Sequence, residues 1–309
     1  MVATRTLDYG VVGGGMLGMT LALRLSEAGH SVTIYEAAST VGGLAGPGTI
    51  GDVTWDRFYH VTLQSDAALL GLMDELGLVD DMQWRPTGTG LFHDGSLHPV
   101  STAMDYLRLP TLGMASKARI GATVLKAAYT SDWQALEQMT AEAWLTKWSG
   151  ARAYESFWKP LLRAKLGNRY DEVSAAFIWA IMQRLYAARR ANMKQDLFGY
   201  LPGGYGRTLA RFAEVLETRG VSVRTSTSVE SIAMGRGRPV VELADGTVSH
   251  DRIVVTLPSP IAATLIPALD ADERERHEAI AYQGIVCPSL LLDRPLSEYY
   301  VTNITDSSS

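Results

Sequence analysis

The sequence has little cysteine, no excess of positive charge and no long uninterrupted apolar run. Its 309 residues include one cysteine, Cys287, which excludes an internal disulfide framework and fits a reducing compartment. The formal net charge of -5 offers no basic surface, so no nucleic-acid partner is expected. No stretch approaches the roughly eighteen apolar residues that a spanning helix needs, and the first residues lack a leader pattern. These absences predict a cytoplasmic protein with no integral membrane segment.

The first forty residues carry the pattern of a parallel crossover unit. Residues 7–12 form a short, mostly apolar run that predicts a buried strand. Residues 16–29 have apolar side chains, Leu17 among them, at helical spacing, and Gly29 is placed to end the helix. Residues 31–36 are rich in β-branched side chains and predict a second strand. A strand, a helix and a strand in about thirty residues are typical of a βαβ unit.

The predicted secondary structure changes twice along the rest of the chain. Residues 63–200 are mostly helical in pattern, with one hairpin whose turn falls at Asp94–Gly95. From residue 201 onward, a glycine-rich turn and a helix are followed by several β-rich segments. We therefore predict an α/β fold in which a mostly helical part interrupts a discontinuous α/β domain. The apolar residues 284–296 predict one more strand, with Cys287 buried inside it.

Three glycines at a characteristic spacing lie between the first predicted strand and helix. They are Gly13, Gly15 and Gly18, and Glu36 follows 18 residues later at the end of the second strand. The first glycine permits a tight turn, the second lets a pyrophosphate approach the backbone, and the third lets helix and strand pack closely. An acid at the position of Glu36 accepts hydrogen bonds from a ribose. This combination predicts a dinucleotide site, whereas a glycine-rich turn without a ligand is the alternative.

The fingerprint alone does not choose between NAD and FAD. The carboxylate of Glu36 disfavours a 2′-phosphate and therefore NADP. A second glycine pair, Gly42–Gly43, follows the acid closely and favours an extended flavin dinucleotide that passes near the backbone. An ordinary loop is the alternative interpretation of the pair.

Three stretches resemble the FAD-dependent amine oxidase superfamily. "VVGGGMLGMTLALRLSEAGHSVTIYEAASTVGGLAG" is similar to its N-terminus, "YLPGGYGRTLARFAEVLETRGVSVRTSTSVESI" to its second shared block, and "DRIVVTLPSP" to its third. The helical part resembles the protoporphyrinogen-oxidase-like branch most. The resemblance implies a Rossmann-type FAD-binding domain at 1–62 and 201–260, and an inserted, mostly helical substrate domain at 63–200 and 261–309 that is incomplete at its C-terminus.

The resemblance also implies a set of cofactor-binding residues. The glycine loop would hold the pyrophosphate, Glu36 the ribose, the second glycine pair would lie along the cofactor, and a Tyr-His pair would lie near the flavin ring. The full set is Gly13, Gly14, Gly15, Met16, Leu17, Gly18, Glu36, Ala37, Gly43, Leu44, Tyr59, His60 and Val229. His60 is also the candidate catalytic residue, because a histidine can exchange a proton near neutral pH.

The activity implied by the resemblance is an FAD-dependent oxidoreductase that transfers hydride from a small-molecule substrate to the flavin. Two alternatives remain: a non-redox flavin enzyme similar to UDP-galactopyranose mutase, and a truncated chain that binds a dinucleotide without catalysis. The family's C-terminal block has no counterpart here, Leu44 replaces a common arginine, and Cys287 aligns near a lysine of the amine oxidases. No metal site is expected, since His93 and His98 flank a hairpin turn. The sequence does not indicate an oligomeric state.

Overall fold

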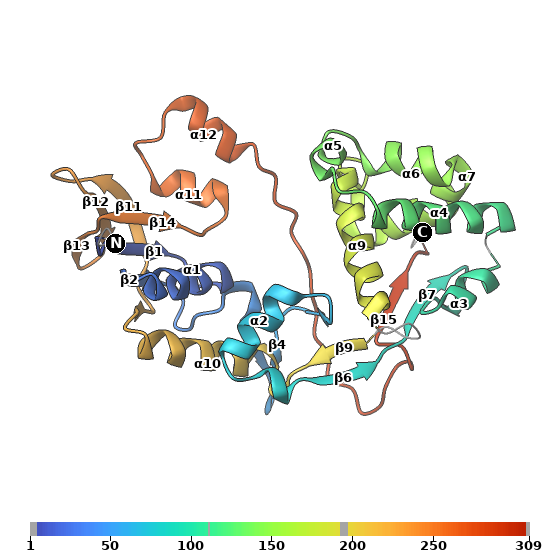
Figure 1. Cartoon of the computed structure of the whole chain (residues 1–309), viewed down its shortest axis with the longest axis horizontal. Coiled ribbons are helices and arrows are strands. Elements are labelled where there is room, and N and C mark those ends of the chain that lie inside the picture. The colour runs from blue at the N-terminus through green and yellow to red at the C-terminus, as the bar shows by residue number, and fades with distance from the viewer. Residues whose placement is uncertain (1–4, 111, 192–196, 307–309) are drawn as a thin grey trace. The chain divides into compact units, whose positions relative to one another are not determined.

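The computed structural model describes residues 5–110, 112–191 and 197–306 (Figure 1). The chain divides into two compact units, each described by itself below. Unit 1 comprises residues 1–60, 72–81 and 201–291, and unit 2 comprises residues 61–71, 82–200 and 292–309.

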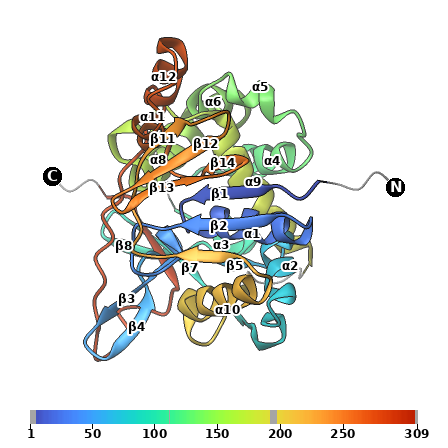
Figure 2. The same ribbon diagram turned by 90° about the vertical axis from the view of Figure 1, so that its left-hand side faces the viewer.

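Unit 1 contains the crossover unit that the sequence predicts. A parallel sheet has the strand order β10-β2-β1-β14, so the first strand pairs with a strand more than 200 residues later in the chain (Figure 2). A second, antiparallel sheet has the order β11-β12-β13, and β3 and β4 form a hairpin. The elements are β1 (Asp8–Val12), α1 (Met16–Glu27), β2 (Ser31–Tyr35), η1 (Gly43–Ala45), β3 (Pro47–Ile50), β4 (Val53–Asp56), η2 (Val79–Asp81), α10 (Gly204–Thr218), β10 (Ser222–Arg224), β11 (Val229–Met234), β12 (Pro239–Leu243), β13 (Gly246–Ser249), β14 (Arg252–Val255), α11 (Ser259–Leu265) and α12 (Ala271–Glu278).

The core of unit 1 follows from the pattern of its apolar residues. Val11, Val12 and Ile34 of the central strands are buried, as a parallel sheet covered on both faces requires. Helix α1 buries Met19 and Leu23, and it ends before Gly29, whose positive φ of 84° is the left-handed conformation of a helix C-terminus. The sequence pattern predicted the helix correctly, although Leu17 lies outside the buried face.

Unit 2 is built on a bundle of helices with two small sheets. Its sheets have the orders β5-β9-β6 and β15-β7-β8. Helix α2 (Ala67–Glu75) begins in unit 2 and ends in unit 1. The other elements are β5 (Thr62–Leu63), β6 (Gln83–Pro86), β7 (Thr89–His93), β8 (Ser96–Pro99), α3 (Ala103–Arg108), α4 (Met114–Ala128), α5 (Trp133–Glu137), α6 (Ala141–Ser149), α7 (Ala151–Ala153), the π-helix η3 (Tyr154–Trp158), α8 (Lys159–Leu166), η4 (Gly167–Arg169), α9 (Ala175–Ala191), β9 (Leu197–Tyr200) and β15 (Val301–Ile304).

Large aromatic side chains form the centre of the helical core of unit 2. Trp144, Tyr154, Phe157 and Trp158 are all buried there. The indole N–H of Trp158 donates to the hydroxyl of Ser149 at 3.0 Å, so this buried donor is satisfied. Trp158 therefore contributes both packing and a specific polar contact.

The architecture is α/β, with a discontinuous parallel-sheet unit and a mostly helical insertion, as predicted. The predicted hairpin at Asp94–Gly95 is β7–β8. The compact units place residues 72–81 and 261–291 in unit 1, whereas the sequence predicts them in the substrate domain. The predicted strand at 284–296 is wrong: these residues form no strand, and Cys287 is exposed rather than buried. None of the helices formed by the described residues is both long and apolar enough to cross a membrane.

Candidate functional site

The first glycine loop joins β1 to α1 with glycine where other residues would not fit. Gly13 has a φ of 107°, and a Cβ on Gly18 would collide with the carbonyl oxygen of Gly13. The hydroxyl of Thr256, at the end of β14, donates to the carbonyl oxygens of Val12 and Gly13 at 3.0 and 3.1 Å. A Cβ on Gly15 would meet no atom within 4 Å. Thr256, at the end of β14, therefore holds the loop in place, whereas the space next to Gly15 is free of protein atoms.

The open side of the loop is the N-terminus of α1. Gly15 is the N-cap residue and makes no side-chain cap, so the first backbone N–H groups of the helix, including those of Met16 and Leu17, have no acceptor within the helix. These N–H groups and the helix dipole attract an anion such as a phosphate. The side chain of Leu17 is 69% exposed beside them. The helix end is therefore chemically suited to a pyrophosphate.

Glu36 lies against the same loop. One carboxylate oxygen accepts the N–H of Gly14 at 2.7 Å, and the other accepts the N–H of Ala38 at 2.9 Å. Each carboxylate oxygen can accept a further hydrogen bond, so both remain usable by ribose hydroxyls. Ala37, which lies between Glu36 and Ala38 in the sequence, is exposed. The backbone thus holds the Glu36 carboxylate at the edge of the glycine loop.

A partly buried chain of hydrogen bonds supports the end of β2. The hydroxyl of Tyr35 bonds to Nε2 of His250 at 2.8 Å, and Nδ1 of that ring bonds to Asp8 at 2.9 Å. The ring fits because Gly10 has no side chain to displace it. Burial raises the pKa of Tyr35, so its hydroxyl stays protonated at neutral pH. The chain fixes the residue that directly precedes Glu36.

The second glycine pair packs on the first glycine loop. The N–H of Gly42 donates to the carbonyl of Gly14 at 2.8 Å, and a Cβ on Gly43 would lie 3.3 Å from the Cα of Gly15. Gly42 has a φ of 121°, and a Cβ there would collide with Leu209 of α10. Packing against the first glycine loop and against Leu209 therefore explains the glycine pair without a ligand. Leu44, which follows it, is 75% exposed.

Tyr59 and His60 lie at another place in unit 1, after β4. The ring of His60 lies 4.8 Å, centroid to centroid, from the ring of Tyr205 at the start of α10. Asp56 accepts the N–H of Tyr205 at 2.8 Å and so anchors this helix end to β4. Nδ1 of His60 is buried and has no hydrogen-bond partner among the described residues. A buried polar atom of this kind requires a partner, such as a ligand or a water molecule.

Val229 is the first residue of β11. The chain just before it runs along the segment after β2, since the N–H of Thr227 donates to the carbonyl of Glu36 at 2.9 Å. The pairing of β11 with β12 is irregular between Val229 and Ser231. The fold thus brings Val229 to the neighbourhood of Glu36, although the two are far apart in the sequence.

The residues present fit a dinucleotide. An open helix N-terminus above Gly15 suits a pyrophosphate, the adjacent carboxylate of Glu36 suits a ribose, and the exposed Leu17 and Leu44 offer apolar surface beside them. The buried Nδ1 of His60, which has no hydrogen-bond partner among the described residues, is a further polar group that a ligand could contact.

Sequence reasoning missed three supporting residues. Thr256 holds the first loop, Leu209 packs on the second, and Tyr205 contacts His60. The sequence predicts the stretches that contain them only as β-rich segments or as a glycine-rich turn followed by a helix. Their contacts depend on strand and helix pairings across about 150 to 240 residues, which local patterns do not specify.

A possible ligand group for a metal occurs at the hairpin turn of unit 2. His93, Asp94 and Asp306 each offer an atom within 4.8 Å of the others. Asp306 already accepts the N–H groups of Asp94 and Gly95 at 2.6 and 3.0 Å, and the bond from Gly95 lowers the pKa of Asp306. The arrangement is therefore explained by a carboxylate that caps the turn.

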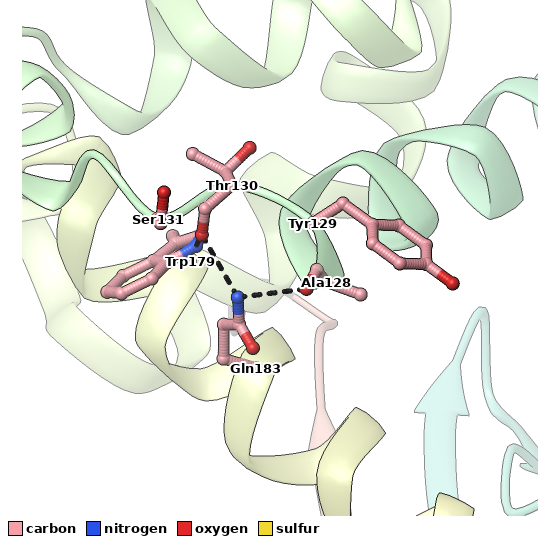
Figure 3. A pocket seen from close by; sticks show the side chains of 6 residues that line it. All are labelled: Ala128, Tyr129, Thr130, Ser131, Trp179 and Gln183. Atoms are coloured by element: carbon pink, nitrogen blue, oxygen red, sulfur yellow. Dashed lines mark hydrogen bonds between the residues drawn. The ribbon is translucent and has the colours of Figure 1, made fainter.

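A pocket of about 460 Å³ lies between the end of α4 and α9 in unit 2 (Figure 3). Gln183 donates to the carbonyls of Ala128 and Thr130 at 3.2 and 3.1 Å, and the indole N–H of Trp179 donates to Thr130 at 3.0 Å. These donors satisfy the last carbonyls of α4 and its following turn. The side-chain N–H groups of Trp179 and Gln183 are thus used to cap the C-terminal end of α4.

Comparisons with known proteins identify the family of this chain. The model of a family described as flavin containing amine oxidoreductase matches residues 17–307. A 15-cis-phytoene desaturase of Solanum lycopersicum is 22% identical over 285 residues, 85% of this chain and 48% of that protein. Putrescine oxidase of Kocuria rosea is 32% identical over 126 residues, 38% of this chain and 26% of that protein.

Solved structures share the fold. An oxidoreductase from Methanosarcina mazei superposes with a TM-score of 0.67 at 18% identity, over 88% of this chain and 64% of that one. A triple mutant of putrescine oxidase gives a TM-score of 0.68 at 18% identity, over 88% and 63%. The chain thus spans about half the length of the phytoene desaturase and under two thirds of these structures.

Proposed function

This chain belongs to the flavin-containing amine oxidoreductase family, and from that premise we propose that it acts as an FAD-dependent oxidoreductase on a small organic substrate. The observation that supports FAD binding most is the helix N-terminus above Gly15 with the Glu36 carboxylate beside it. Bound FAD supplies the hydride acceptor, while the protein supplies binding, orientation and electrostatics.

The binding roles follow from the chemistry of each group. We assign the pyrophosphate to the N–H groups at the start of α1, where an anion is favoured. We assign the adenosine ribose to Glu36, whose negative charge repels a 2′-phosphate. Gly14, Met16, Ala37, Gly43 and Leu44 would line this path, and Val229 would contact the adenine through its backbone.

His60 is proposed as the polar group nearest the reacting centre. Its buried Nδ1 is available to a ligand, and its ring is oriented by Tyr205. It would hold or move a proton at that nitrogen. We expect His60→Asn to leave the flavin content unchanged and to lower the rate of flavin reduction by substrate about 100-fold. Equal rates for both proteins would remove His60 from the catalytic role.

We assign different binding roles to the two units. Unit 1 carries the whole proposed nucleotide site, and unit 2 is proposed to contribute the substrate-binding part. A cytoplasmic location and a small-molecule substrate complete the proposal.

Direct titration with four nucleotides tests the proposal. The purified chain is titrated with FAD, NAD⁺, NADP⁺ and ADP, and binding is followed by quenching of tryptophan fluorescence. We expect saturable binding of FAD, at least tenfold weaker binding of ADP, and no binding of NADP⁺. Preferential binding of NAD⁺ would contradict the assignment to FAD.

A further inference from the structure

Helix α4 of unit 2 has apolar side chains on its outer face as well as on its inner face. The inner face buries Ile120 and Ala127 in the helical core. The outer face carries Met114, Leu125 and Tyr129, which are 68%, 50% and 73% exposed. These three side chains lie on one side of the helix, because their separations are close to whole turns of about 3.6 residues. We call this row the α4 stripe.

The α4 stripe is a surface of unit 2 itself. Helix α4 lies within residues 82–200 and packs on α6 and α9 of the same unit. The exposed fractions refer to the whole chain, and unit 2 by itself exposes these side chains at least as much, because taking neighbouring atoms away uncovers surface and never covers it. The stripe is therefore left uncovered by its own unit, wherever unit 1 lies.

Positive charges stand beside the α4 stripe. Helix α4 contains no acidic residue, and Arg119 and Lys126 lie on one flank of the stripe. The ammonium groups of Lys126 and Lys147 lie 5.3 and 5.8 Å from the ring centroid of Trp148, which is 38% exposed on α6. Within the part of the chain that the structure describes, no carboxylate forms an ion pair with these three cations. The surface is therefore both apolar and cationic.

We propose that the α4 stripe and its flanking cations bind the surface of an anionic lipid bilayer. Apolar side chains on one side of a helix enter the boundary between headgroups and acyl chains, while lysine and arginine attract anionic headgroups. Tyrosine and tryptophan are enriched at this depth of a membrane. The backbone of a helix satisfies its own hydrogen bonds, so it tolerates contact with lipid. The proposal concerns unit 2 and does not rest on the flavin site.

Two other occupants fit the α4 stripe less well. In a second copy of the chain packed stripe to stripe, Arg119 and Lys126 would meet only like charges, because α4 has no acidic residue. Peptides bind in grooves between elements or along the edges of sheets. The outer face of a single helix offers neither, so charge and shape together favour the bilayer.

Vesicle co-sedimentation of the whole chain tests the proposal. We expect binding to vesicles of phosphatidylcholine with phosphatidylglycerol to be about tenfold stronger than binding to phosphatidylcholine alone, and to weaken as salt is added. Lys126→Gln should weaken binding to the anionic vesicles about fivefold, and Leu125→Ser about tenfold. The matched controls are Lys165→Gln, at an exposed position on α8, and Ile261→Ser, at a 50% exposed position on α11; both should bind like the parent. Circular dichroism verifies that each variant is folded.

A polarity-sensitive dye locates the contact. Cys287 is the one cysteine of the chain, so Ala118→Cys in a Cys287→Ser background places a single dye on the outer face of α4. Ala164→Cys in the same background places it at an exposed position on α8. We expect the anionic vesicles to shift the emission of the dye at position 118 to the blue and to leave that at position 164 unchanged.

Four results would overturn the proposal. They are no binding to the anionic vesicles, equal binding to phosphatidylcholine alone, binding without a shift of the dye at position 118, and binding of poly-glutamate by a chain that does not bind vesicles. The last result would assign the surface to an acidic polypeptide instead.

Discussion

Glu36 is the residue whose carboxylate would distinguish the proposed ribose-binding site from a glycine-rich turn without a ligand. Replacing it with glutamine keeps the shape but removes the charge from an acceptor that already holds the N–H of Gly14. A hydrogen bond to a charged group contributes about 1.5–3 kcal/mol. We expect Glu36→Gln to weaken FAD binding by roughly 10- to 100-fold, measured by fluorescence titration. Glu230→Gln, at an exposed position in β11, is the control and should bind FAD like the parent.

Gly18 tests the packing beneath the proposed pyrophosphate. A methyl group there would meet the carbonyl oxygen of Gly13, so helix α1 would have to move away from β1. We expect Gly18→Ala to lower the free energy of unfolding by about 1–3 kcal/mol and to abolish FAD binding.

The control for Gly18 is another glycine within a helix. Gly121 in α4 has no atom within 4 Å of an added Cβ, so Gly121→Ala should stabilise the protein by about 0.4–1 kcal/mol. If both substitutions had the same effect in urea unfolding, close packing at Gly18 would not be the cause.

The residues of the proposed site are easier to predict from the sequence than the residues that support them. Spacing and residue type predict Gly13, Gly15, Gly18 and Glu36 as site residues, because each would satisfy a local geometric requirement. Thr256 was not identified, since its role exists only once β14 pairs with β1.

At the scale of elements, one ion pair joins α9 to the start of α2. Arg184 donates to both carboxylate oxygens of Asp66, which is mostly buried, and the N–H of Leu63 donates to Asp66 at 2.8 Å. Burial alone would raise the pKa of Asp66, but these hydrogen bonds outweigh it and lower the pKa. The ion pair therefore stabilises the fold at pH values above the ordinary pKa of an aspartate.

The lowered pKa of Asp66 gives a pH-dependent prediction. Stability from the pair is fully present above the unfolded-state pKa, about 3.9, and is lost as the pH falls through the lower folded-state pKa. We expect Asp66→Asn to cost about 1–2 kcal/mol at pH 7 and progressively less below pH 4, from urea unfolding. Asp74→Asn, at an exposed position on α2, should cost little at either pH. A cost of Asp66→Asn that stayed constant down to pH 2 would contradict the ion pair.

Elements were predictable where their pattern is local. The βαβ unit and the hairpin at Asp94–Gly95 are correct, because strand alternation and turn residues act over a few positions. The strand at 284–296 was not formed, because a strand needs a neighbour and the described chain provides none there. Leu17 is one of the apolar residues whose spacing predicts α1, and its side chain is exposed beside the glycine loop.

For the whole molecule, the central claim is that unit 1 holds a flavin although the chain spans only part of its relatives. Every residue that we propose to contact the nucleotide lies within unit 1.

The most direct test of that claim is the visible absorbance spectrum of the purified chain, before and after anaerobic reduction with dithionite. We predict a flavin spectrum at close to one FAD per chain that bleaches on reduction, either as purified or after incubation with FAD. A colourless protein that takes up no FAD would contradict the account.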